Sequence, residues 1–365
     1  MKKLLTYFLL VAMLSCREDD DAGAALLPDS LQVEVTLTGP TTVRVRATAR
    51  HANYFQVYFG ERSDEMPVRT TTGEASYTYK QEGSFTIRVQ AHATDNDFIT
   101  ESKTISIELK DELVIPSEGY STPETYSGMQ LVWQDEFNGD QLNNESWSFE
   151  IGTGEHGWGN NELQYYRSEN TSVVDGHLMI TAKKESYQGS EYTSSRLITQ
   201  GKFDFQYGRV DIRAVLPRGQ GIWPALWMLG SSFASEGWPR CGEIDIMEMI
   251  GGSGRENTVH GTVHWDSDGH VSYGKGYSLS SGTFADKFHV FSIVWDANTI
   301  RWYVDDVEYN VIDITPGGLS EFHQPFFLIF NVAVGGDWPG SPDAATVFPQ
   351  RLIVDYVRVF QPEDN

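Results

Sequence analysis

The sequence predicts an all-β protein with two sandwich domains. From residue 31 to residue 109, apolar and polar residues alternate with period two, which is typical of strands with one buried face. From residue 129 to residue 362, many short strand-like runs follow one another without long helical periodicity. A length of 365 residues suits two domains. Between them, residues 111–127 have the Pro, Gly, Ser and Thr content of a linker.

Residues 1–15 have the pattern of an export signal. Two lysines precede a largely apolar run, Leu4 to Leu14, that is too short to span a bilayer. Cys16 directly follows a small residue, Ser15, which resembles the site where bacterial lipoproteins are cleaved before a lipidated cysteine. We therefore expect lipidation at Cys16. The alternative is a secreted protein that loses Cys16 together with its signal.

Residues 16–30 are expected to form an acidic spacer. The run from Arg17 to Asp21 resembles the tag that sends some Gram-negative lipoproteins to the outer face of the outer membrane. We therefore expect an outer-membrane lipoprotein that is exposed at the cell surface. Its contact with the membrane would be the lipid anchor alone, and we expect a monomer.

Residues 31–110 are predicted to form the first, smaller sandwich. Strand-like runs within it include Val33–Leu37, Val43–Ala47 and Phe85–Val89, separated by Gly, Pro and Asp turns. Residues 77–87 resemble the late strands of PKD or immunoglobulin-like modules. For its role, a spacer that lifts the next domain off the membrane is favoured over sugar binding.

Charge and cysteine content restrict the partners. A net charge of -24 argues against nucleic acid, whose phosphates need Lys and Arg, and it disfavours sulfated polysaccharides at long range. The two cysteines, Cys16 and Cys241, are not expected to form a structural disulfide, because Cys16 follows the apolar signal segment. The spacings of the cysteines and histidines do not fit a metal site with Cys and His ligands.

Residues 128–362 are predicted to form the larger domain. Its strand-like runs include Leu178–Ala182, Arg209–Ala214, Phe291–Trp295 and Ile353–Val359. So many strands over this length predict two packed antiparallel sheets. One sheet face would be available for a chain-like ligand.

The run Glu243–Glu248 places three carboxylates among apolar residues. Burying an acid costs free energy unless it is paired or used in function. Residues i and i+2 of a strand share a face, so Glu243 and Asp245 point the same way and Glu248 points to the other side. One extra residue, a β-bulge, returns Glu248 to the shared face, and Met247 is the natural place for it.

Hydrolysis of a glycosidic bond needs two carboxyl groups in different protonation states. In a retaining enzyme these groups lie about 5–5.5 Å apart, whereas four strand steps separate Cα atoms by about 13 Å. Long Glu side chains on a bent strand would have to close that gap. For this run taken alone, the alternative is a strand with an acidic solvent face.

The surrounding sequence resembles family 16 of the glycoside hydrolases. The run matches the signature Glu-x-Asp-x-x-Glu, in the form with the bulge residue that laminarinases, agarases and carrageenases carry. Further matches follow in order at Trp133–Phe137, Trp158–Tyr166, Ser195–Arg196, Trp223–Trp227, His260–Trp265, Asn331–Gly336 and Val354–Val357. The resemblance implies a jelly-roll sandwich with a substrate cleft. It also implies Glu243 as nucleophile, Asp245 as its partner and Glu248 as general acid/base, with retention of configuration.

The stretch from Asn160 to Tyr165 resembles the laminarinase branch, which cuts β-1,3-glucans. We therefore expect an endo-β-1,3-glucanase whose partner is a laminarin-like β-glucan polysaccharide. The enzyme alternatives are a mixed-linkage β-glucanase or an agarose-type galactan hydrolase of the same family. A non-catalytic glycan-binding surface protein is the alternative from another class.

Six residues are candidates for contacts with the sugar. They are Asn160, Arg196, Trp223, Trp227, Trp238 and His264. Indole rings suit the C–H-rich faces of sugars, but core packing competes for each of them. We expect packing for at least one of Trp223 and Trp227, and a ligand role for Trp238. For Arg196 and for His264, a buried structural role is expected as much as a contact with a sugar hydroxyl.

No cofactor is expected for catalysis. Many members of the family carry a calcium ion away from the cleft, and it would be structural. Glu136, the Gly176 carbonyl and Asp355 match its usual places and offer oxygen ligands. The alternative is that these carboxylates only tie strand ends together.

Overall fold

The structure is a computed structural model that describes residues 26–39, 41–79, 81–107 and 113–363. The predicted signal at residues 1–15, the lipidation site Cys16 and residues 16–25 of the predicted spacer lie outside this part of the chain. Within it, no helix combines the length and the apolar character needed to cross a membrane.

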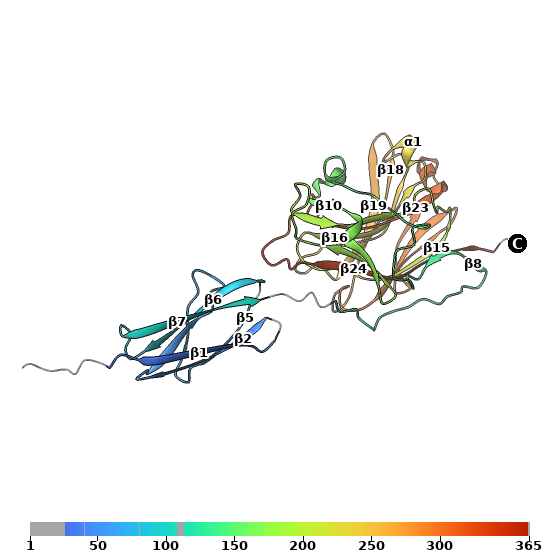
Figure 1. Ribbon diagram of the computed structural model, residues 1–365. Helices are drawn as coiled ribbons and strands as arrows, with labels where there is room; N and C mark the ends of the chain where they lie inside the picture. Colours follow the sequence, from blue (N-terminus) through green and yellow to red (C-terminus); the bar gives the residue numbers. More distant parts are fainter. Residues whose placement is uncertain (1–25, 40, 80, 108–112, 364–365) are drawn as a thin grey trace, which may run out of the picture. The chain divides into compact units, whose positions relative to one another are not determined.

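The chain divides into two compact units between Glu112 and Leu113 (Figure 1). In both units the regular secondary structure is almost entirely strand, which confirms the all-β prediction. The helical segments of the described residues are short. They are η1 (Gly157–Asn161), η2 (Ser168–Asn170), α1 (Phe233–Glu236) and η3 (Gly317–His323).

The first unit consists of a three-stranded and a four-stranded antiparallel sheet. The three-stranded sheet has the order β1 (Asp29–Leu37), β2 (Thr42–Arg50), β5 (Glu74–Thr78). The four-stranded sheet has the order β4 (Val68–Thr70), β3 (Tyr54–Tyr58), β6 (Gly83–His92), β7 (Phe98–Ile107). Alternate residues of these strands, such as Val43, Val45, Ile87 and Val89, are fully buried in its core. Its assignment to the PKD or immunoglobulin-like modules stays a prediction.

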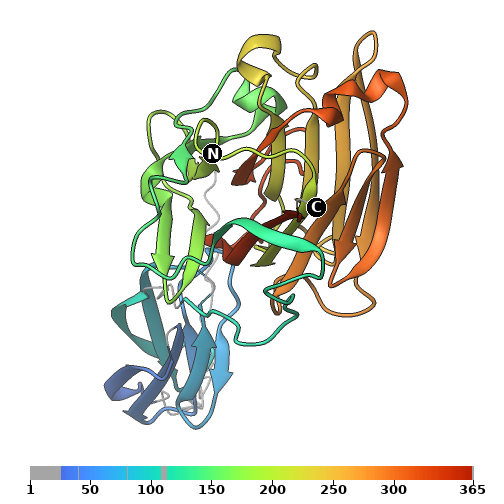
Figure 2. The ribbon, with the colours of Figure 1, turned by 90° about the vertical axis from the view of Figure 1, so that its right-hand side faces the viewer.

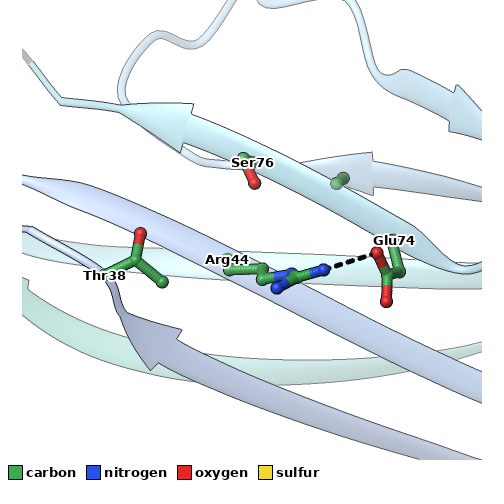
Figure 3. Close-up of a pocket in the computed structure, with 5 residues that line it drawn as sticks. Thr38, Arg44, Glu74 and Ser76 are labelled. Carbon is green, nitrogen blue, oxygen red and sulfur yellow. Dashed lines mark hydrogen bonds and ion pairs between the residues drawn. The ribbon is translucent and has the colours of Figure 1, made fainter.

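A pocket on the three-stranded sheet contains an ion pair between Arg44 and Glu74 at 2.7 Å (Figure 3). Both side chains are more than a third exposed, and exposed pairs contribute little to stability. The other residues that line it are Thr38, Ala75 and Ser76, so the pocket offers no aromatic ring to a sugar.

The second unit is a sandwich of two large sheets. The first has the order β11 (Thr171–Val174), β12 (His177–Ala182), β24 (Gln350–Pro362), β15 (Gly208–Val215), β20 (His289–Trp295), β21 (Thr299–Val304), β22 (Val307–Asp313), and β8 (Met129–Asp135) also pairs with β24. The second has the order β19 (His270–Ser278), β18 (Thr258–Asp266), β17 (Glu243–Glu248), β16 (Ile222–Gly230), β23 (Phe326–Val334), β14 (Arg196–Ile198), β9 (Ser148–Phe149). A short parallel pair is formed by β10 (Gln164–Tyr166) and β13 (Tyr192–Ser194).

The main core fills the space between these two sheets. Ile212 and Val354 face it from the first sheet, and Leu226, Ile244 and Phe330 face it from the second. The short helices η1 (green), α1 (yellow) and η3 (orange-red) lie towards one end of this sandwich (Figure 2).

The described residues of the predicted linker are held on the second unit. Gly119 forms a bridge with Phe288, and a Cβ at Gly119 would lie 2.2 Å from the Phe288 carbonyl oxygen, so this approach requires glycine. The Thr122 N–H donates to the Tyr356 hydroxyl at 2.8 Å, and the Tyr126 hydroxyl donates to Asp211 at 2.6 Å. Residues 119–126 thus belong structurally to the second unit.

Candidate active site

Strand β17 carries a bulge. On β16, the neighbours Leu226 and Trp227 pair with Met247 and Asp245, so Ile246 is left without a partner. The pairing with β18 is shifted over the same stretch. The predicted bulge is confirmed, although the unpaired residue relative to β16 is Ile246 and not Met247.

The bulge turns two successive side chains into the core. Ile246 and Met247 are both buried in the cluster between the two sheets, as is Ile244. Because the period of two is broken once at this point, Glu243, Asp245 and Glu248 share the opposite, outer face of the sheet. The three acids therefore lie on one surface, as the strand parity required.

Each glutamate accepts a hydrogen bond from a tryptophan. Trp238 Nε1 donates to Glu243 Oε2 at 2.7 Å, and Trp223 Nε1 donates to Glu248 Oε1 at 3.0 Å. Trp238 lies between α1 and β17 and is 47% exposed, whereas Trp223 is half-buried on β16. Both indoles therefore contact the acids directly, and Trp238 also offers an open ring surface.

Asp245 joins Glu243 to His264. His264 Nε2 lies 3.1 Å from Asp245 Oδ2 and 3.8 Å from Glu243 Oε1. The buried Trp302 donates to the Asp245 backbone carbonyl at 2.8 Å. Asp245 is only 2% exposed, so it acts within the site through these neighbours.

His270 fixes the ring of His264 from its other side. His264 Nδ1 lies 2.7 Å from His270 Nε2, and the two rings stack with centroids 5.0 Å apart. The His270 ring also lies 4.6 Å from that of Trp238. The imidazole of His264 is therefore held on both nitrogens beside the acids.

Burial raises the pKa of all three carboxyl groups. For Glu243, burial and then the charge of Asp245 raise the pKa to about 8, against the opposing effects of His264 and the Trp238 N–H. Burial raises the pKa of Asp245 to about 7. Burial and the charges of both other acids raise the pKa of Glu248 well above its ordinary value. Three such groups cannot all be ionised at neutral pH, so they share protons.

The surroundings distinguish the two glutamates. Glu248 experiences the charges of both other acids, whereas Glu243 experiences chiefly that of Asp245. Glu243 also accepts a short hydrogen bond from Trp238, which favours its charged form. This difference favours Glu243 as the ionised acid and Glu248 as the acid that keeps its proton.

Arg196 packs against two indole rings, those of Trp158 and Trp227, and this arrangement is called the Arg196 clamp. Its guanidinium carbon lies 4.6 Å from the Trp158 ring centroid and 4.9 Å from the Trp227 ring centroid. Its Nε donates to Glu150, and no other acceptor for its guanidinium lies among the residues that the structure describes. The terminal N–H groups of Arg196 are therefore available to a ligand.

Of the predicted sugar contacts, Trp223, Trp238 and His264 lie directly at the acids. Trp227 is half-buried on β16 and donates through Nε1 to Asn331 at 2.8 Å, so its N–H is engaged within the protein. Asn160 donates to Glu162 at 3.3 Å, which likewise ties its amide to the protein.

Other residues of the site were not singled out from the sequence. Trp338 is 40% exposed and its ring contacts those of Trp223 at 5.6 Å and His260 at 5.1 Å. Trp158 lies inside a stretch that resembles the family, so the sequence indicated that this residue belongs to the domain's matched motifs. The sequence did not indicate its contact with Arg196. Trp338 lay outside every matched stretch.

The residues predicted for calcium form ion pairs. Both Glu136 carboxylate oxygens accept from Arg358, at 2.7 and 2.8 Å. Asp355 accepts from Arg213 at 2.6 Å, and Gly176 lies in the turn between β11 and β12. Because each of the two carboxylates, Glu136 and Asp355, already pairs with an arginine, their arrangement in the structure does not fit a calcium site. Calcium stays a prediction from the family resemblance, and no reaction step is assigned to it.

Comparison with known proteins identifies the family of the second unit. The model for glycosyl hydrolases family 16 matches residues 159–358, which is more than half of the chain. The chain belongs to this family. A second model, for beta-glucan synthesis-associated protein SKN1/KRE6/Sbg1, matches residues 66–240 and overlaps the first. The family 16 hydrolases need no cofactor for catalysis.

Relatives of this family 16 protein include enzymes with named activities. The chain is 46% identical to the beta-glucanase of Rhodothermus marinus, over 64% of this chain and 85% of that protein. It is 41% identical to the clotting factor G alpha subunit of Tachypleus tridentatus over 64% of this chain, but spans only 34% of that protein.

A solved structure supports the same assignment. The laminarinase catalytic domain from Thermotoga maritima MSB8 is 47% identical and superposes with a TM-score of 0.61. The match covers 65% of this chain and 99% of that chain. The expected family and its jelly-roll sandwich are thereby confirmed.

We predict that replacing His264 by Gln moves both limbs of the pH profile of kcat/KM to higher pH. His264 lowers the pKa of Glu243 and of Glu248, so its loss raises both. Activity that needs ionised Glu243 then appears at higher pH, and activity that needs protonated Glu248 persists to higher pH.

The measurement is the pH dependence of initial rates at low substrate concentration, for both proteins. His177→Gln is a matched control, because His177 lies on the other sheet, beside Asp355. Limbs that stay in place, or that move to lower pH, in the His264 variant would contradict the assigned electrostatics.

Proposed function

We propose that this protein is an endo-β-1,3-glucanase that hydrolyses laminarin-like glucans with retention of configuration. The observation that supports it most is the bulged strand β17, which brings Glu243, Asp245 and Glu248 to one sheet face. The names of the Thermotoga and Rhodothermus relatives support the glucan substrate.

In the first step of the proposed reaction, Glu243 acts as the nucleophile. One of its carboxylate oxygens attacks the anomeric carbon, and the bond from that carbon to the glycosidic oxygen breaks. Glu248 gives its proton to the leaving oxygen, so the first product departs as a neutral alcohol. The sugar is then held on Glu243 as a covalent ester.

In the second step, Glu248 acts as the base. Its carboxylate takes a proton from a water molecule, and the water oxygen attacks the same anomeric carbon. The bond to Glu243 breaks and Glu243 regains its charge. Two inversions at one carbon retain the β configuration, and both acids return to their starting states.

The electrostatics of the site suit this cycle. When Glu243 becomes an ester it loses its charge, and the repulsion that keeps Glu248 protonated falls. Glu248 can then lose its proton and serve as base. Asp245 and His264 hold Glu243 in place throughout, because both lie beside it and neither changes its bonds.

Mixed-linkage glucan and agarose-type galactan are the alternative substrates. The net charge of -24 disfavours sulfated galactans. A non-catalytic glycan-binding protein is disfavoured because binding alone does not require two glutamates with raised pKa values on one face.

We predict that incubation with laminarin, lichenan, agarose and carrageenan releases oligosaccharides from laminarin at the highest rate. Chromatography of the products measures this and separates endo from exo action by product length. Laminarin left intact while agarose is degraded would overturn the proposal. Glu243→Gln serves as control, and its turnover should fall by a factor on the order of 10⁴. Unchanged turnover would remove Glu243 from the role of nucleophile.

We further propose that the protein is an exported lipoprotein anchored through Cys16. The proposal rests on the apolar run of residues 4–14, the following cysteine and the acidic run after it. Lipidation would leave the catalytic unit in water while the chain is tethered to the membrane.

We predict that Cys16→Ser abolishes lipid labelling of the full chain in a Gram-negative host. A clickable fatty acid supplied during growth, followed by detergent phase separation, measures labelling and anchoring. Cys241→Ser is the matched control, because Cys241 is a buried thiol of the second unit. The Cys241→Ser chain should still carry the lipid label. A wild-type chain without label would contradict the proposal.

A further inference from the structure

Glu162 is an acid that the proposed reaction does not use. It lies between η1 and β10, and burial raises its pKa although several donors oppose this. Its Oε2 accepts from Gln164 at 2.7 Å and from the Tyr166 hydroxyl at 3.1 Å, and its Oε1 accepts from Asn160 at 3.3 Å. Three donors on one carboxylate require it as an acceptor.

A chain of hydrogen bonds runs from Glu162 to the outer face of the second sheet. The Tyr166 hydroxyl donates to Glu162 and accepts from Asn331 Nδ2 at 3.1 Å. Asn331 Oδ1 in turn accepts from Trp227 Nε1 at 2.8 Å. Tyr166 and Asn331 each use one donor and one acceptor in a fixed direction, so they link the Trp227 N–H to the acceptor at Glu162.

The direction of this chain cannot reverse without breaking a bond. Gln164 Oε1 accepts from the Val334 N–H at 2.7 Å, so its amide nitrogen must face Glu162 as a donor. The indole of Trp227 can only donate, so Asn331 must present its oxygen there. The substitution Glu162→Gln would keep one acceptor oxygen but place its amide N–H group against at least one of the three donors.

Both indole rings of the Arg196 clamp are held by this chain of hydrogen bonds, one of them through ring packing on Tyr166. The ring of Tyr166 packs against Trp158 with centroids 5.5 Å apart, and Tyr166 also supports Trp227 through Asn331. Trp158 and Trp227 are the two rings against which the Arg196 guanidinium packs.

Arg196 stands on the same sheet row as Glu248. It pairs with Asn331, which pairs with Ala225, which pairs with Glu248. Three strand spacings place the two backbones about 14 Å apart, so Arg196 and Glu248 lie on strands that two others separate. A sugar chain that crosses the strands would meet Arg196 with a unit remote from the reacting carbon.

We propose that Glu162 is a positioning residue that keeps Arg196 clamped for a hydroxyl of a remote sugar unit. The proposal rests on the proposed function, because it deepens substrate binding at the same site. Loss of Glu162 would weaken substrate binding through Arg196 and would leave the three acids of β17 unaltered. Its effect therefore belongs in KM and in binding, with kcat preserved.

The test compares Glu162→Gln with wild type on whichever polysaccharide of the panel the wild type cleaves. We expect KM to rise about tenfold, as the loss of one hydrogen bond to a charged group produces, with kcat changed less than about twofold. The pH profile of kcat should keep both limbs in place. In a Glu243→Gln background, calorimetry should show oligosaccharide binding weakened by the same factor.

Two further variants make the result decisive. Tyr166→Phe keeps the ring against Trp158 but removes the hydroxyl of the chain, so it should reproduce the rise in KM even if Glu162→Gln fails to fold. Glu169→Gln, an exposed acid paired with Arg167, is the matched control and should leave KM unchanged.

Unchanged KM in both folded variants would overturn the proposal, as would a fall in kcat with a shifted pH profile. If laminarin is uncut but another glucan or galactan is cleaved, the substrate assignment fails while Glu162 is still tested on the true substrate.

Discussion

The break of strand period at Ile246 and Met247 is the constraint on which the rest of the site depends. Both side chains enter the core between the sheets, and this double insertion turns Glu248 onto the face of Glu243 and Asp245. Burial of three acids on one face then raises the pKa of each. A backbone irregularity thereby becomes the source of the protonation states that the proposed reaction uses.

The neighbours of the acids divide into two groups with different tasks. Trp238, Trp223 and His264 touch the carboxylates and tune which of them is charged. Further along the same face, Glu162 and Asn331 hold aromatic rings and touch no catalytic acid. The acids and the Arg196 side chain are thus supported by separate hydrogen-bond networks on one sheet, and we expect substitutions in the two networks to affect different kinetic constants.

The sequence predicted what depends on local period and missed what depends on long-range contact. Strand parity demanded a bulge, but the choice between Ile246 and Met247 depends on the partner strand β16. Tryptophans near the acids were found because they lie close in the chain, whereas Asn331 meets Tyr166 only after folding. The composition of residues 111–127 indicated a linker, yet Thr122 and Tyr126 bind the second unit through partners more than eighty residues away.

The anomer released first from the substrate tests the central claim most directly. Two glutamates that act in turn on one carbon conserve its configuration, whereas direct attack by water inverts it. Proton NMR during the first minutes of laminarin hydrolysis, before mutarotation, distinguishes the two. The bulged strand with Glu243 as nucleophile predicts the β-anomer first, followed by slow growth of the α-anomer. An initial burst of α-anomer would contradict it.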